Sequence, residues 1–331
     1  MNRAYEKGLV NVLVPCYNGE AYINRFFRSF EKQTYRPIEL ILVNDGSTDE
    51  SDALIRKEIE ELSQTGIRVN YIVQENRGLG GAINRAIKEI RGEYFVWFNI
   101  DDVLEPDCIE TMANFLNANS EYAIVRPNVN MAHEDAPEVI TGRINDGNPD
   151  AAKPDLFENA LTEKNFTFGC SMIRSKVFDE VNPARETYPS RKGQNWQLLL
   201  PVFYKRKSGY IEKPLYTVIV QNQSTSVVTG YEKTLAQKRE HEKILLETLA
   251  RMDLPEEERN AYRESVRLRY GKELFWLSVT SGDFVTAKEY YRFLKSRHVL
   301  SKGWKKVYAK RFFKIEYWSG LKKKLFSHPK K

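Results

Sequence analysis

The residues of this 331-residue chain that are best suited to chemistry are three carboxylates in two short segments. Asp101 and Asp102 stand side by side, and Asp45 lies between an asparagine and a glycine. Adjacent carboxylates supply the hard oxygen ligands that Mg²⁺ or Mn²⁺ prefers. A single carboxylate such as Asp45 can accept a hydrogen bond from the N–H of a nucleotide base.

Two further segments carry groups that suit the rest of a nucleotide. Residues 75–82 read Glu-Asn-Arg-Gly-Leu-Gly-Gly-Ala, so a cation and three glycines stand where a helix is expected to begin and where backbone amides can meet phosphate. Residues 15–20 read Pro-Cys-Tyr-Asn-Gly-Glu and offer an aromatic ring. Taken together, a ring, a base-reading carboxylate, a cationic glycine loop and an acid pair suit a nucleoside diphosphate.

Each of these features also has an ordinary structural interpretation. Asp and Gly form turns readily, and an acid pair is most often a solvated loop. The glycine-rich stretch does not complete the dinucleotide fingerprint, because Ile83 stands where its third glycine belongs. The functional interpretation therefore depends on the four segments sharing one place in the fold.

The predicted secondary structure gives them that place. Short apolar runs at 9–14, 38–43, 68–73 and 94–100 predict buried strands, and helical periodicity separates them. Such β-α repeats predict a mostly parallel sheet covered by helices, whose ligands bind beyond the carboxyl ends of the strands. One polar segment follows each strand. Beyond them we expect loops with short elements at 126–165, strands at 166–174 and 210–220, an amphipathic stretch at 196–204 and helices from 231 onward.

Composition is typical of an ordinary globular protein, with 41% hydrophobic and 29% charged residues. The polar N-terminus does not resemble a secretory signal, and no apolar run reaches the ~18–20 residues that span a bilayer. Three widely spaced cysteines, Cys16, Cys108 and Cys170, argue against a disulfide framework. We therefore expect a cytoplasmic protein with reduced thiols.

The positive charge is concentrated in the last thirty residues. Residues 302–331 hold eleven Lys or Arg and one acid, a net +10, whereas the whole chain is +6, so residues 1–301 sum to −4. A nucleic-acid substrate is disfavoured, because the main body lacks a basic excess. Aromatic and aliphatic residues recur near helical spacing in this tail, which favours a basic amphipathic helix on an anionic membrane surface, here the inner face of the cell membrane. The alternative is a helix that packs on the protein with its cationic face in solvent.

The four segments, in their order, resemble family-2 glycosyltransferases, enzymes of the GT-A fold that are mostly inverting. The resemblance covers residues 9–125 strongly and 166–226 more loosely. It implies that Pro15 and Tyr17 line a base pocket, that Asp45 reads a uracil-type imide and that Asp101 binds the metal. The full set of residues expected to bind the nucleotide sugar is Pro15, Tyr17, Asn18, Glu20, Asp45, Asn76, Arg77, Gly78, Asn99 and Asp102.

Three positions depart from the family pattern. The first acid of its D-x-D element is Asn99, its Glu-Asp pair with the general base falls at Gln194 and Asn195, and its late histidine is Gln221. An amide cannot take a proton from an acceptor hydroxyl at neutral pH. Either another carboxylate serves, or the acceptor needs no base, or the protein binds without turnover.

The sequence thus predicts an α/β GT-A domain over residues 1–230, with a nucleotide-sugar half at 1–125 and an acceptor half at 126–230. A helical region at 231–331 follows and ends in the basic tail. The expected reaction moves a sugar from a nucleoside diphosphate, expected to be UDP, to a glycan or lipid-linked acceptor with Mn²⁺ or Mg²⁺. The alternatives are a catalytically inactive transferase relic and a sugar-nucleotide nucleotidyltransferase, although the latter would carry a basic glycine-rich loop after the first strand.

Overall fold

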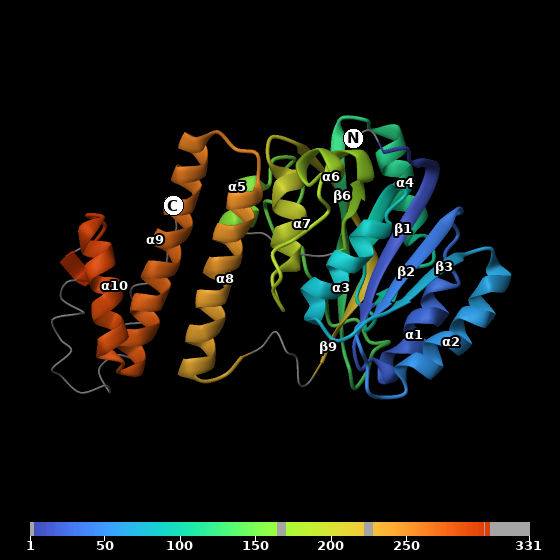
Figure 1. Ribbon diagram of the computed structural model, residues 1–331, viewed down its shortest axis with the longest axis horizontal. Helices are drawn as coiled ribbons and strands as arrows, with labels where there is room; N and C mark the ends of the chain where they lie inside the picture. Colours follow the sequence, from blue (N-terminus) through green and yellow to red (C-terminus); the bar gives the residue numbers. More distant parts are fainter. Residues whose placement is uncertain (1–2, 164–169, 222–227, 301, 305–331) are drawn as a thin grey trace. The chain divides into compact units, whose positions relative to one another are not determined.

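The computed structural model describes residues 3–163, 170–221, 228–300 and 302–304 (Figure 1). The chain separates into two compact units, one of residues 1–224 with 250–253 and one of residues 225–249 with 254–331. The expected boundary at residue 230 lies close to this division. Whether the two parts fold as separate domains stays a prediction.

The first unit is built on one mixed sheet, in the order β3-β2-β1-β4-β8-β6-β9-β5, with β7 paired to β6. Its parallel part consists of β1 (Glu6–Cys16), β2 (Ile38–Asn44), β3 (Arg68–Val73) and β4 (Gly92–Trp97). The apolar content of β1, β2 and β4 reflects their burial in the sheet. The strand at 68–73 was also expected to be buried, but β3 lies at the edge of the sheet and its residues are partly or fully exposed. The expected α/β fold is confirmed. The fourth strand ends at Trp97 rather than at residue 100.

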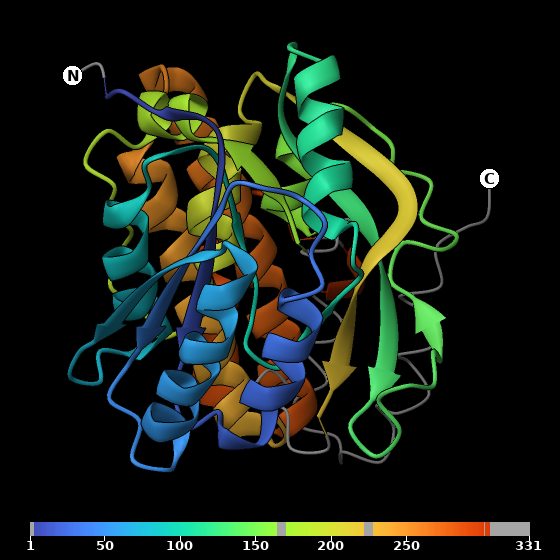
Figure 2. The ribbon, with the colours of Figure 1, turned by 90° about the vertical axis from the view of Figure 1, so that its right-hand side faces the viewer.

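Helices cover both faces of the parallel part. The first face carries α1 (Glu20–Phe30), α2 (Ser51–Leu62) and α4 (Cys108–Ala118), which enclose one apolar core with alternate residues of the strands (Figure 2). The connection from β3 to β4 crosses the other face, as right-handed crossovers require, and contains α3 (Gly78–Ala86). Two more helices, α6 (Ser175–Val181) and α7 (Gln194–Phe203), contact α3 or β4 there.

The second half of the sheet corrects one expectation. Residues 126–165 were expected to form loops with short elements, as β7 (Gly142–Arg143) and α5 (Phe157–Thr162) are, but β6 (Tyr122–His133) runs through Pro127 as a twelve-residue strand. Its polar residues are buried and bonded: Arg126 donates to Ser208 Oγ at 3.1 Å, and Asn128 Oδ1 accepts from the amide of Asn145 at 3.2 Å. Polar residues that are hydrogen-bonded inside a core give the same sequence pattern as a loop.

The direction of the remaining strands matters for the site. Both β4 and β6 are antiparallel to β8 (Met172–Arg174), so they run the same way, and β9 (Lys207–Val220) is parallel to β6. The carboxyl end of β9 therefore points in the direction of those of β1 to β4. The two-residue β5 (Val103–Leu104) closes the sheet against β9. Of the expected strand at 166–174, residues 172–174 form β8, residues 170 and 171 are not in a strand, and residues 166–169 lie outside the described ranges.

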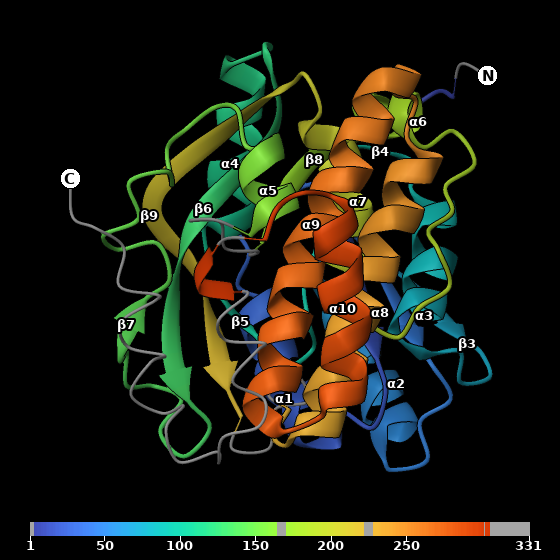
Figure 3. The same cartoon turned by 90° about the vertical axis from the view of Figure 1, so that its left-hand side faces the viewer.

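The second unit is helical, as expected. Its elements include most of α8 (Tyr231–Arg251), with α9 (Glu256–Ser281) and α10 (Phe284–Ser296) side by side (Figure 3). Pro255 precedes α9 and Gly282 ends it. Phe275 and Trp276 of α9 pack with Leu294 and with Trp304. Across the residues described, no helix is both long and apolar enough to cross a bilayer.

Candidate functional site

The segments after β1 and β2 are joined into one structure at the rim of the sheet. Asn18 adopts a φ of 49°, in the left-handed region that asparagine tolerates, and so turns the first segment toward the second. Hydrogen bonds then run in both directions: Asn18 N–H to Ser47 Oγ (3.0 Å), Thr48 N–H to Asn18 Oδ1 (2.8 Å), Gly19 N–H to Ser51 Oγ (2.8 Å), Glu50 N–H to Glu20 Oε2 (3.0 Å) and Glu20 N–H to Asp49 Oδ2 (3.2 Å). Asn18 and Glu20 thus shape the rim, and their contact with a ligand stays a prediction.

Tyr17 lies at the surface of this rim, with half of its side chain exposed (52%), whereas Cys16 beneath it is buried. An exposed ring beside polar groups offers a face on which a base can stack. Burial raises the pKa of the Cys16 thiol to about 11, which makes it unreactive at neutral pH. The three cysteines are buried and unpaired, in agreement with the expected absence of disulfides.

Asp45 is buried at the end of β2, and the segment after β3 surrounds it. Its Oδ1 accepts from Gln74 Nε2 at 2.7 Å and from the backbone amide of Arg77 at 2.9 Å. Among the described residues, no donor reaches its Oδ2. The carboxylate thus has one oxygen fixed by the protein and one available to a donor from outside.

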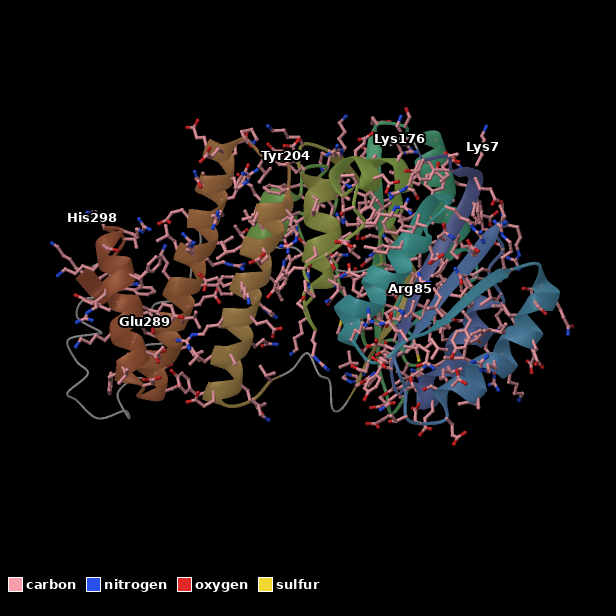
Figure 4. All side chains as sticks on the ribbon, viewed as in Figure 1. Lys7, Arg85, Lys176, Tyr204, Glu289 and His298 are labelled. Carbon is pink, nitrogen blue, oxygen red and sulfur yellow. The ribbon has the colours of Figure 1, made fainter. Side chains whose placement is uncertain are left out.

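The glycine-rich segment begins α3, as the sequence predicts, and a second segment of the chain lies against it (Figure 4, where Arg85 marks this helix). The amide of Gly80 donates to the carbonyl of Ser190 at 3.2 Å. A Cβ at Gly80 would lie 2.2 Å from that oxygen, so this approach requires glycine. The amides of Arg77 and Gly80 are therefore already bonded within the protein. Asn76 and the Arg77 side chain are exposed.

The acid pair after β4 meets the end of β9. Asp101 Oδ2 accepts from Gln221 Nε2 at 2.6 Å, its backbone oxygen accepts from Arg25 at 3.0 Å, and Asp102 Oδ2 accepts from Asn99 Nδ2 at 3.1 Å. Burial raises the pKa of Asp101, and burial with the neighbouring Asp101 charge raises the pKa of Asp102 well above its usual range. Such a pair is stabilised in its ionised form by a nearby cation.

These residues fit a divalent ion in the chemistry of their donors. Asp101 supplies a carboxylate, and Gln221 can offer its amide oxygen once its N–H is released from Asp101. Within the described ranges no group of three His, Cys, Asp or Glu side chains converges on a metal position. The protein would therefore supply only part of a coordination sphere, as is usual where phosphates and water supply the rest.

The expected catalytic pair lies at the start of α7, and its two members differ in surroundings. Gln194 is buried, and its Nε2 donates to the Ser190 carbonyl at 2.8 Å. Asn195 is partly exposed. Gln194 therefore holds the segment before α7 in the shape that meets Gly80, which leaves Asn195 as the member of the pair that is partly open to solvent.

Sequence reasoning missed the residues that link these parts. Gln74, Ser190 and Arg25 each contact a predicted site segment, but each is a single polar residue without a pattern. Gln221 was singled out only as a departure from the family, and the antiparallel pairing of β5 with β9, with Val103 opposite Thr217, is what brings it to Asp101. No spacing rule connects positions that are 120 residues apart.

Known proteins similar to this chain include glycosyltransferases. The model of the family described as glycosyl transferase family 2 matches residues 11–181, more than half of the chain. An uncharacterized glycosyltransferase of Rickettsia bellii is 33% identical over 200 residues, 59% of this chain and 27% of that protein. The chain spans about a third or less of the length of the first curated relatives that it matches.

Solved structures show the same fold. S. aureus TarS 1-349 in complex with UDP-GlcNAc has a TM-score of 0.59 at 18% identity, covering 80% of this chain and 72% of that one. The mannosyltransferase PcManGT from Pyrobaculum calidifontis, in complex with GDP-Man and Mn²⁺, has a TM-score of 0.50 at 14% identity, covering 96% and 88%. Both likenesses concern the fold.

Proposed function

The chain belongs to glycosyl transferase family 2, and on that premise we propose that it transfers a sugar from a UDP-sugar to a glycan or lipid-linked acceptor. The observation that carries this proposal is that three groups follow the carboxyl ends of strands in the parallel part of one sheet. Asp45 has an available carboxylate oxygen, Arg77 begins the glycine-rich helix, and Asp101 lies after the next strand of the same sheet. These groups suit, in that order, the base, the phosphates and the metal of a metal-bound nucleoside diphosphate.

The base and phosphates would be bound by the chain's own residues. Asp45 would accept the imide N–H of uracil through Oδ2, while Pro15 and Tyr17 line the base and Asn18, Glu20, Asn76, Gly78, Asn99 and Asp102 complete the pocket. Arg77 would pair with phosphate oxygens. A UDP-GlcNAc complex of a protein with this fold supports the choice of donor.

Asp101 and the amide oxygen of Gln221 would hold the divalent ion. When bound, such an ion offsets the negative charge that develops on the leaving diphosphate. The Mn²⁺ in PcManGT supports Mn²⁺ as the metal. Burial raises the pKa values of Asp101 and Asp102, and a bound cation would stabilise their ionised forms. This support for a metal comes from the chain's own residues.

Asn195 would orient the acceptor by hydrogen bonding, with inversion at the sugar carbon. An acceptor that is already anionic, such as a phosphate, gains nothing from a carboxylate base and would be repelled by one. Asn195→Asp should then not accelerate transfer, whereas Asn195→Ala should impair it. A positioned general base raises the rate of transfer to a hydroxyl acceptor by ~10²–10⁴-fold. A rate gain of that size in Asn195→Asp would show that the site still needs a base.

The test is a screen of nucleotide sugars for donor hydrolysis or transfer with Mn²⁺ present. We expect release of UDP from one UDP-sugar, abolished by EDTA and by Asp101→Ala. If the protein binds UDP but releases no UDP from any UDP-sugar, the result would favour an inactive transferase relic. This is the second candidate function, because amides stand at Gln194 and Asn195 where the family has its Glu-Asp pair. The family match gives no support to a nucleotidyltransferase.

A further inference from the structure

We propose that Arg191, in the segment before α7, forms with Arg77 the diphosphate-binding pair of this site. The inference rests on the proposed function, because it assigns a residue to the same nucleotide. Arg191 lies 109 positions after the end of the glycine-rich segment at 75–82. No motif in the sequence points to it.

Close packing brings Arg191 to the first turn of α3. A Cβ at Gly78 would lie 2.9 Å from Arg191 Cγ and 3.7 Å from its Cδ. One turn further, a Cβ at Gly81 would lie 2.3 Å from Arg77 Cβ. Both arginine side chains therefore leave the backbone beside the same helical turn, and the bond from Gly80 to Ser190 fixes the segment that carries Arg191.

The charges gathered there lack a counterion within the protein. Both arginines are exposed residues, and among the described residues neither side chain makes an ion pair or a hydrogen bond. The amino end of α3 adds its own positive partial charge. Asp45 accepts from the backbone amide of Arg77 and not from its guanidinium group. Two like charges at a positive helix end repel one another, and a bound anion relieves that repulsion.

Gln194 provides an independent sign that a ligand belongs at this turn. Its carboxamide lies against Gly80, with Nε2 2.8 Å from a Cβ built there, and only 1% of the side chain is exposed. Nε2 must face the Ser190 carbonyl, which can only accept, so the amide orientation is fixed. Its Oε1 is buried without a hydrogen-bond partner. A hydroxyl of a sugar attached to the diphosphate is the kind of donor that this oxygen lacks.

Calorimetric titration with UDP and with uridine, in buffer containing Mn²⁺, tests the assignment. Arg191→Gln should lower UDP affinity between about ten- and a hundredfold, the usual cost of a lost charge-assisted hydrogen bond. Uridine, which has no phosphate, should bind as to the wild type. The loss of UDP affinity in Arg191→Gln should be smaller at high salt, because salt screens the charge interaction. Arg191→Lys should recover part of the UDP affinity. The matched control is Arg28→Gln, an exposed arginine on α1, which should leave both affinities unchanged.

Three results would overturn the assignment in distinguishable ways. Unchanged UDP affinity in Arg191→Gln would remove Arg191 from the diphosphate and leave the proposed function standing. Equal losses for UDP and uridine would show that Arg191 acts on the shape of the site rather than on phosphate. Failure of the wild type to bind UDP would reject the proposed function itself.

Discussion

At Asp45 the two carboxylate oxygens have different surroundings, and this difference makes the residue testable. Oδ1 is held by Gln74 and by the amide of Arg77, whereas Oδ2 has no donor among the described residues. Asparagine has the same shape and can keep an oxygen at the first position. Its amide nitrogen then replaces Oδ2, so that a donor meets the imide N–H of the base.

Asp45→Asn should therefore weaken UDP binding by roughly 1–3 kcal/mol, the cost of a mismatched buried polar group. Titration calorimetry measures this directly. The melting temperature should stay near that of the wild type, because the protein's own hydrogen bonds are kept. Unchanged affinity for UDP would remove Asp45 from the base pocket.

The sequence predicted the chemical type of several site residues but not the contacts that position them. Asp45 and Asp101 were predicted because a strand end before an acid is a local pattern. Ser190 and Arg191 reach α3 through tertiary packing, and Gln221 reaches Asp101 because β5, which follows Asp101, pairs with β9. A single sequence contains no local signal for such contacts.

At the scale of elements, α3 and the segment before α7 are joined at a glycine. Asn84 of α3 adds to the junction, donating to the carbonyl of Thr187 at 3.1 Å and accepting from its amide at 2.7 Å. Gly80 is the point of closest approach, and Gln194 packs on the same spot.

Gly80→Ala should force the two elements apart, because its Cβ would meet a backbone oxygen that cannot rotate away. We expect a loss of about 1–3 kcal/mol in the free energy of unfolding, typical of overpacking, and weaker UDP binding. Chemical denaturation and calorimetry measure the two effects. Gly142→Ala is the matched control, since a Cβ there has no neighbour within 4 Å.

The bounds of elements were predicted well where apolar residues recur at regular spacing, even in the partly exposed β3, and poorly where polar groups are buried. The third strand, 68–73, has the predicted bounds, and α7 differs by two residues at its start and one at its end. The strand β6 was missed because Arg126, Pro127 and Asn128 are typical of loops. Their hydrogen bonds inside the sheet offset the cost of burying them, and a local pattern does not contain those partners.

At the scale of the whole molecule, one ion-pair network joins the amino end of the chain to α6. Asp179 of α6 accepts from Arg185 Nε at 2.6 Å, from Arg3 at 2.9 Å and from the Tyr5 hydroxyl. Arg185 is buried and also donates to the carbonyls of Ile87 and Ile90. Burial alone would raise the pKa of Asp179, but these hydrogen bonds and charges outweigh it and lower the pKa.

Because the folded pKa is below the unfolded one, Asp179 stabilises the fold at pH values above the usual carboxyl range. That contribution is lost as pH falls through the folded pKa. Asp179→Asn should cost about 3 kcal/mol at pH 7, since it leaves buried Arg185 without its carboxylate. The difference from the wild type should narrow below about pH 4. Urea unfolding at a series of pH values would show this, and a pH-independent difference would contradict the linkage.

The basic tail belongs to the same scale, and its role stays a prediction because residues 305–331 lie outside the described ranges. The ring of Trp304 stacks on that of Phe275, with 5.3 Å between the ring centroids. A truncation should therefore begin after Trp304, so that this packing is kept. Removing residues 305–331 takes away ten Lys or Arg, each worth about 1 kcal/mol near an anionic surface.

The truncated protein should keep its UDP affinity and lose sedimentation with phosphatidylserine vesicles, and added salt should release the full-length protein too. Neutral phosphatidylcholine vesicles serve as the control. If both forms sediment equally with the anionic vesicles, the tail has no membrane role.

The reciprocal bonds between residues 15–20 and 47–51 have a consequence for how this protein can be re-engineered. Each segment supplies acceptors for the amides of the other, so neither keeps its shape when its partner is replaced. A chimera that takes residues 15–20 alone from a relative should lose nucleotide binding. Exchange of both segments together should restore it. In laboratory evolution toward another donor, substitutions in the two segments should accordingly be selected as pairs, and libraries that vary only one of them should be depleted of binders.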